Sequence, residues 1–162
     1  MQKSESLGYK GRYKLLAPHV THAFHLRLMV QIAAGRYWHK ATEMNKQALV
    51  AAFSKVSIGT YAARFNDFSG QSFKTLEIKP GTQDTHLVVT QLINPNGEEV
   101  DLTYVTKEIG KDWRIIDVIL ANGISELAMR RSEYRQVLKQ GGVKALTTLL
   151  NKKAKMLATS LD

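Results

Sequence analysis

A segment near the carboxyl end of the chain places a charged side chain within an apolar helical stripe. Tyr134 and Leu138 follow Leu127 by seven and eleven residues, so the three side chains lie on one face of a helix. Arg131 follows Leu127 by four residues and so falls inside this stripe. A buried guanidinium needs a partner, because an unpaired charge away from water is costly. Arg131 therefore either binds an anionic group of a ligand or pairs with Asp117, and we favour the internal pair.

Other side chains of this sequence belong to the types that perform acid–base or metal chemistry. Asp117 with Tyr104 or His86 has the groups that proton transfer needs, although a lone carboxylate on a strand is more often structural. Three histidines recur every three residues: His19, His22 and His25. The first and the last of them lie about 240° apart around a helix, which disfavours one shared metal site. The sequence has no cysteine, no glycine-rich phosphate loop and no nucleophile elbow. We expect no catalytic residue, no metal site and no cofactor.

The net charge of +9 is concentrated in two segments of the chain. Residues 1–64 hold ten Lys or Arg against two acids, and residues 120–162 hold eight against three. The stretch 65–119 is acidic, because it holds five Lys or Arg against nine Asp or Glu. Basic surfaces favour anionic partners such as nucleic acid, anionic lipid or an acidic protein. We do not expect nucleic acid, because the strands show no obvious set of exposed aromatic side chains on which bases could stack.

The amino-terminal part of the chain, residues 9–69, has helical periodicity. A first helical stretch with a break near Pro18 leads to a loop at 35–38. A second helix over 43–68 has apolar residues on two sides, which predicts packing on both, and Gly59 is its candidate kink.

We expect no membrane span in the chain, because no window approaches the ~18–20 consecutive apolar residues that a membrane span requires.

Residues 71–120 change to a period of two and predict a sheet. Turn signals at 94–97 and 109–112 are typical of hairpins, so four segments are expected to pair as antiparallel neighbours: 71–79, 86–94, 98–108 and 113–120. Residues 124–158 return to helix, and a glycine pair divides two short amphipathic helices. The pattern predicts one α+β domain over residues 1–162, in which a curved four-stranded antiparallel sheet packs against helices from both ends of the chain.

A family resemblance extends over nearly the whole chain. The residues that carry it are Arg12-Tyr13, Leu16, Pro18, Phe24, Met29, Gly35, Trp38, Phe53, Tyr61-Ala62, Phe65, Ser69-Gly70, Val89-Thr90 and Trp113 to Val118. In this order they resemble the family of lipid-transport proteins that includes MlaC and the toluene-tolerance proteins. The stretch from Ile124 to Tyr134 is most similar to the branch named for hopanoid biosynthesis, HpnM.

This resemblance implies an MlaC-like fold, akin to NTF2-like domains, with an apolar cavity between sheet and helices. It implies a periplasmic shuttle that carries a phospholipid or a hopanoid-related lipid between an inner-membrane transporter complex and an outer-membrane receptor. The polar residues 2–6 contain no apolar leader segment, which fits either a cytosolic protein or one whose signal peptide has been removed. The resemblance implies the cleaved signal peptide. The alternative is an NTF2-like small-molecule enzyme with an acid–base site in the cavity.

A lipid carrier is also reasonable on physical grounds. At roughly 0.8 kcal/mol per methylene, exposing a chain of about 16 carbons to water costs ~12 kcal/mol, so unassisted transfer is very slow. A carrier needs an apolar cavity with an opening and no catalytic group. The residues that we expect to bind the lipid are Phe24, Met29, Tyr61, Phe65, Leu102, Tyr104, Val118, Leu127, Arg131, Tyr134, Leu138 and Leu146. The alternative for each apolar member is that it only fills the core.

Overall fold

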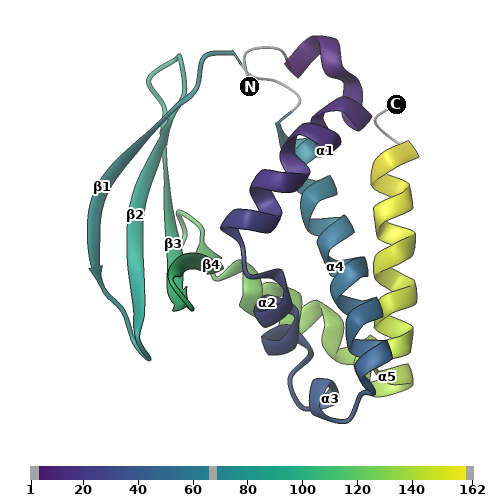
Figure 1. Cartoon of the computed structure of the whole chain (residues 1–162). Coiled ribbons are helices and arrows are strands. Elements are labelled where there is room, and N and C mark those ends of the chain that lie inside the picture. The colour runs from purple at the N-terminus through teal and green to yellow at the C-terminus, as the bar shows by residue number, and fades with distance from the viewer. Residues whose placement is uncertain (1–3, 66–68, 160–162) are drawn as a thin grey trace.

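The computed structural model describes residues 4–65 and 69–159, which form a layer of helices beside an antiparallel sheet (Figure 1). The helices before the sheet are α1 (Ser4–Ala23), α2 (Leu26–Ala34), α3 (Arg36–His39) and α4 (Glu43–Arg64). The sheet contains β1 (Ser72–Pro80), β2 (Thr85–Ile93), β3 (Glu99–Ile109) and β4 (Asp112–Ile119), and α5 (Glu126–Thr159) follows it. The α+β architecture expected from the sequence is confirmed.

Side chains and glycines set the limits of the helices. The side-chain oxygen of Thr42 accepts the backbone N–H of Asn45 at the start of α4, at 3.3 Å. At the start of α2, Nδ1 of His25 accepts the N–H of Leu28 at 3.0 Å. The expected glycine break is confirmed inside α5, where Gly142 has a φ of +60° that favours glycine. This bend turns the second half of α5 along α4 (Figure 1).

The four strands pair in sequence order, each antiparallel to the next. The register shifts by one residue between Thr75 and Glu77 of β1, and again in the β3–β4 pair beside Thr106. Such bulges bend a strand and increase the local twist. The sheet is accordingly curved and open, with β1 and β4 at its edges (Figure 1).

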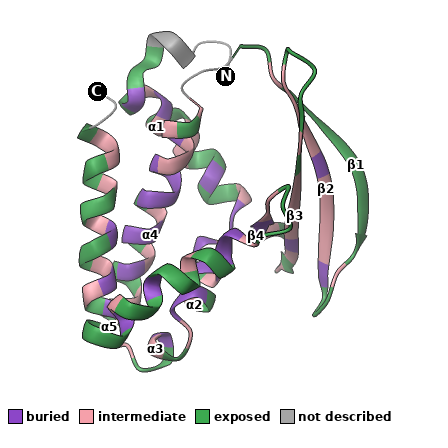
Figure 2. Ribbon diagram, turned by 180° about the vertical axis from the view of Figure 1, so that it is seen from behind, coloured by how far each residue is buried: buried purple, intermediate pink, exposed green. Residues whose placement is uncertain are grey.

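The most deeply buried side chains lie among the helices. Four of the largest have an exposed fraction of zero: Leu49, Phe53, Leu146 and Leu150. On the sheet, Val118 of β4 joins this core, and β4 contacts α1, α2 and α5. Figure 2 shows the same asymmetry, because buried residues concentrate in the helices whereas β1 is exposed along its length. The helices therefore pack mainly on one another, and the sheet is joined to them through β4.

The first helical stretch does not break at Pro18 as the sequence suggested. Helix α1 continues through Pro18 and instead leaves helical geometry at Gly8. The chain interrupts the helix again after Ala23, where His25 donates its backbone N–H to the carbonyl of Ile115 at 2.9 Å. Contact with β4, a segment remote in sequence, therefore separates α1 from α2.

Two further expectations about the helices are wrong. The loop expected at 35–38 contains α3, and Gly59 does not kink α4. A Cβ at Gly59 would lie 2.6 Å from the hydroxyl oxygen of Tyr9, so the glycine serves the close approach of α1 to α4. Helix α4 ends at Arg64, and residues 66–68 of the expected helix lie outside the described residues.

Candidate functional site

The side of the sheet that faces the helices carries apolar side chains on all four strands. Cross-strand neighbours share a face, and one such row is Ile78, Val88, Tyr104 and Val118. A second row on the same face is Phe73, Leu92 and Val100. Val118 is in the helical core, and Leu102 and Tyr104 pack against that core, which identifies the helix side. We call these eight residues the apolar sheet face: Phe73, Ile78, Val88, Leu92, Val100, Leu102, Tyr104 and Val118.

The apolar sheet face becomes more exposed from β4 towards β1. Val118 on β4 is 4% exposed, whereas Phe73 and Ile78 on β1 are 53% and 63% exposed. The helices cover the β4 end, and every residue of β1 is exposed (Figure 2). Large apolar side chains thus stand on one edge of the sheet without cover from the helices. Exposed apolar patches of this kind are typical of binding surfaces.

Aromatic side chains gather where α4 approaches this face. The ring centroid of Tyr61 lies 5.4 Å from that of Phe24 and 6.0 Å from that of Phe65, with Tyr61 and Phe65 stacked. Burial raises the pKa of the Tyr61 hydroxyl, and the nearby carboxylate of Glu126 raises it further. The same two causes raise the pKa of Tyr104. Both hydroxyls are therefore neutral at physiological pH and supply hydrogen-bonding groups beside an apolar surface.

The structure separates the residues expected to bind lipid into three groups. One group lies where α4 and the end of α1 meet the sheet: Phe24, Tyr61, Phe65, Leu102, Tyr104 and Val118. A second group is buried in the core of the helical layer: Met29, Leu127, Tyr134, Leu138 and Leu146. Arg131 stands apart from both groups, because its side chain is exposed. Sequence reasoning missed the part of the apolar sheet face on β1 and β2, although its alternating pattern was a usable signal.

The expected ion pair between Arg131 and Asp117 is wrong. The charged residue held among apolar neighbours is Arg130, whose guanidinium lies 5.1 Å from the ring centroid of Phe53. Both arginines border the stripe of Leu127 and Tyr134, separated by about 100° around the helix. Helix α4 packs on the Arg130 side, which sequence periodicity alone does not reveal.

A buried carboxylate provides the counter-charge for Arg130. Glu126 is 7% exposed, and its oxygens lie 3.8 Å from Arg130 and 3.0 Å from Arg64. Arg130 also lies 3.4 Å from the hydroxyl of Ser57 on α4. This cluster joins the first turn of α5 to α4, and it lies close enough to the phenols of Tyr61 and Tyr104 to influence their pKa values.

Asp117 stabilises the start of α5. One carboxylate oxygen accepts the backbone N–H of Leu127 at 3.0 Å and that of Val118 at 2.7 Å, and the other accepts the hydroxyl of Ser125. Asp117 pairs with Val105, so its side chain leaves the sheet on the face opposite to Tyr104. The acid–base pair of Asp117 with Tyr104 that the sequence suggested is therefore not assembled.

The histidines also have structural surroundings. The ring of His86 packs edge-on against Trp113, with centroids 4.5 Å apart, and His25 caps α2. Among residues 4–65 and 69–159, no group of three or more His, Cys, Asp or Glu side chains is arranged to hold a metal ion.

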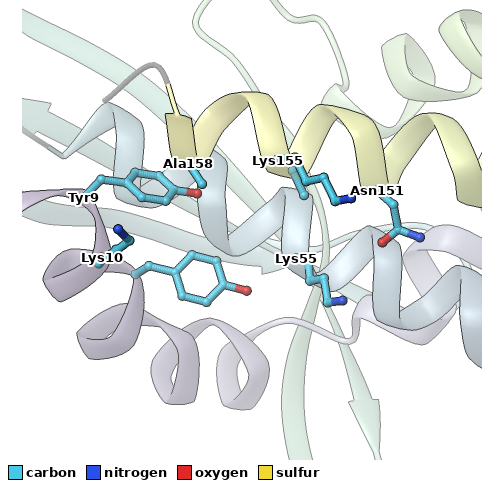
Figure 3. Close-up of a pocket in the computed structure, with 8 residues that line it drawn as sticks. Tyr9, Lys10, Lys55, Asn151, Lys155 and Ala158 are labelled. Carbon is cyan, nitrogen blue, oxygen red and sulfur yellow. The ribbon is translucent and has the colours of Figure 1, made fainter. Parts of the chain in front are cut away.

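Three cavities lined by described residues lie among the helices. Figure 3 shows one of about 330 Å³ between α1, α4 and α5, with Tyr9, Lys55, Asn151 and Lys155 among its lining residues. A second, of about 130 Å³, adjoins the Glu126 cluster, and a third, of about 450 Å³, lies between α2, α3 and α5. None of these three has a wall from the sheet. The cavity expected between sheet and helices stays a prediction.

Comparison with known proteins gives two findings. The sequence model of the MlaC protein family matches residues 1–152. Among solved structures, the fold is similar to that of a phospholipid-binding protein from Ralstonia solanacearum, determined in complex with a phospholipid. The match has a TM-score of 0.84 and covers 98% of this chain and 88% of that chain, at 23% sequence identity. The two proteins therefore share a fold.

Proposed function

Because this chain belongs to the MlaC protein family, we propose that it binds a lipid on its apolar sheet face and carries it between membranes. The observation that carries this proposal is the exposure of Phe73 and Ile78 on β1, at 53% and 63%. Lipid tails on this face would remove apolar surface from water, which is worth roughly 25 cal/mol per Å². The phospholipid bound by the similar Ralstonia protein supports the same function.

We place the lipid tails along the two rows of the apolar sheet face, from β1 towards the aromatic cluster on α4. Tyr61 and Tyr104 would contact the tails through their rings. Their neutral hydroxyls avoid the desolvation cost that a charged group would incur beside hydrocarbon. The lipid headgroup would remain in water at the uncovered β1 edge.

The proposed carrier works in the periplasm, between an inner-membrane transporter complex and an outer-membrane receptor. Among the described residues, no helix has the length and apolar character that crossing a membrane requires. The resemblance of residues 124–134 to the HpnM branch supports a hopanoid-related cargo, and the Ralstonia structure supports a phospholipid. Each cargo is apolar enough to need the proposed surface.

Organic extraction of the purified protein is expected to release lipid in a roughly stoichiometric amount. Mass spectrometry of the extract would identify a glycerophospholipid or a polycyclic triterpenoid and so decide between the two cargoes. A protein of similar size and charge, purified in parallel from the same cells, controls for adventitious lipid. Extracts equal to this control, together with no uptake of labelled lipid by the protein, would rule out the carrier.

Two tryptophan substitutions separate lipid-contacting positions from the core. Tyr104→Trp enlarges a half-buried side chain on the apolar sheet face, so we expect reduced lipid loading in a folded protein. Leu127→Trp enlarges a residue that is 6% exposed, and overpacking is expected to reduce the free energy of unfolding by ~1–3 kcal/mol. Bound lipid and the thermal midpoint are measured on the same samples. A folded Tyr104→Trp protein that still carries the full amount of lipid would show that the lipid does not contact Tyr104.

A further inference from the structure

The cavity between α2, α3 and the first half of α5 has an apolar floor and a strongly basic rim. Its volume is about 450 Å³. Leu138 and two alanines at the end of α2 form apolar parts of the wall, and Gly35 and Tyr37 also line it. Four cationic side chains complete the lining: Arg36, Arg131, Arg135 and Lys139. No acidic residue lines this cavity. All four cationic residues are exposed, so they remain accessible to a ligand from solution.

Among the described residues, these four cations have no acidic partner, in contrast to the arginines that are paired elsewhere. Arg27, Arg64 and Arg130 each lie within 4.0 Å of a glutamate, which is the limit for an ion pair. Within the described part of the chain, no such pair involves a cation of the cavity. Arg36 contacts the hydroxyl of Tyr37 at 3.3 Å, which supplies no negative charge. The cavity therefore concentrates positive charge that the protein does not neutralise.

The spacing of the α5 cations adds a cost that an anion would relieve. Arg131, Arg135 and Lys139 follow one another at intervals of four residues and so lie on one face of the helix. Like charges at this spacing destabilise a helix. Arg36 brings a fourth positive charge from α3, a second helix that forms part of the cavity wall. An anion bound in the cavity would contact cations from both helices.

We propose that this cavity binds a phosphate group carried by a small organic moiety. Guanidinium groups recognise phosphate oxygens in pairs of parallel hydrogen bonds, and three of the four cations are arginines. The volume of about 450 Å³ exceeds what inorganic phosphate fills, and the apolar floor suits an attached organic part. The phosphate belongs either to a soluble phosphate ester or to the headgroup of an anionic phospholipid at a membrane surface. This site is separate from the apolar sheet face and does not depend on the carried lipid.

Charge-removing substitutions test this site with a matched control. The double variant Arg131→Gln/Arg135→Gln removes two cations from the cavity, and Lys144→Gln/Lys152→Gln removes two exposed cations elsewhere on α5. Glycerol 3-phosphate is titrated into each protein while backbone amide resonances are recorded. We expect shifts at residues 33–37 and 131–139 in the unmodified and control proteins, and at least tenfold weaker binding in the cavity variant. Arg131→Lys/Arg135→Lys, which keeps charge but loses paired hydrogen bonds, should bind with intermediate affinity.

Vesicle binding separates the two sources of phosphate. Sedimentation with vesicles of phosphatidylglycerol or of phosphatidylcholine is compared for the same proteins. If the cavity variant loses binding of glycerol 3-phosphate, the result supports the site with a soluble phosphate ester as its ligand. If the cavity variant loses only its binding to phosphatidylglycerol vesicles, the result supports the site with a lipid headgroup as its ligand. Equal binding of both probes by the cavity variant and the control variant would overturn the proposal. The amount of carried lipid, measured after extraction, should be unchanged in all of these proteins.

Discussion

Replacing Phe73 and Ile78 together with asparagine is expected to weaken lipid binding by roughly 30- to 700-fold. Both side chains stand on the uncovered edge of the apolar sheet face, 53% and 63% exposed. Burying two large apolar side chains against lipid is expected to contribute about 2–4 kcal/mol, which corresponds to that range at 1.4 kcal/mol per factor of ten. Equilibrium titration with a fluorescent phospholipid measures the loss, and mass spectrometry of extracts measures the lipid retained during purification.

The same strand provides the control for this experiment. Lys74 and Lys79 lie on β1 with their side chains on the opposite face, so Lys74→Asn/Lys79→Asn introduces the same residues without touching the apolar sheet face. The free energy of unfolding of both double variants should lie within about 1 kcal/mol of that of the original protein, because β1 is exposed throughout. Equal lipid binding by the two double variants would show that β1 does not contact the cargo.

The sequence predicts the architecture well because the two regular periods are local properties of the chain. The change from helical spacing to alternation after Gly70 locates the sheet, and the turn signals at 94–97 and 109–112 fix the antiparallel order. Helix ends were harder to predict wherever a distant segment determines them. The break at His25 arises from its bond to Ile115, ninety residues away in sequence, whereas the proline expected to cause a break lies within α1.

The charged residues of α5 show why a site is harder to predict than a fold. By periodicity Arg130 and Arg131 flank the same apolar stripe on opposite sides, and Arg131 lies nearer to it. Only the position of α4 decides that Arg130 lies over Phe53 while Arg131 faces the basic cavity. The same holds for the apolar sheet face. Alternation identifies its side chains, but which of them the helices leave exposed depends on the tertiary packing of β4.

Asp117→Ala is expected to reduce the free energy of unfolding by about 2–4 kcal/mol. The change removes the acceptor for the backbone N–H groups of Leu127 and Val118 and for the hydroxyl of Ser125. Loss of a helix cap typically costs about 0.5–2 kcal/mol, and a buried donor left without a partner costs about 1–3 kcal/mol. Urea denaturation followed by circular dichroism measures the change. Asp101→Ala, at an exposed carboxylate on β3, is the control and should alter stability by less than about 0.5 kcal/mol.

A double-mutant cycle tests whether Asp117 acts through the start of α5. Ser125 donates to Asp117 and also accepts the N–H of Ala128 at 2.9 Å, so Ser125→Ala alone should cost about 1 kcal/mol. The two substitutions should be less than additive, with a coupling of at least ~0.5 kcal/mol, because each removes the shared hydrogen bond. Strict additivity would mean that Asp117 stabilises the fold in another way. Because Glu126 begins α5 and binds both Arg64 and Arg130, a loosened helix start should also weaken the joint between α5 and α4.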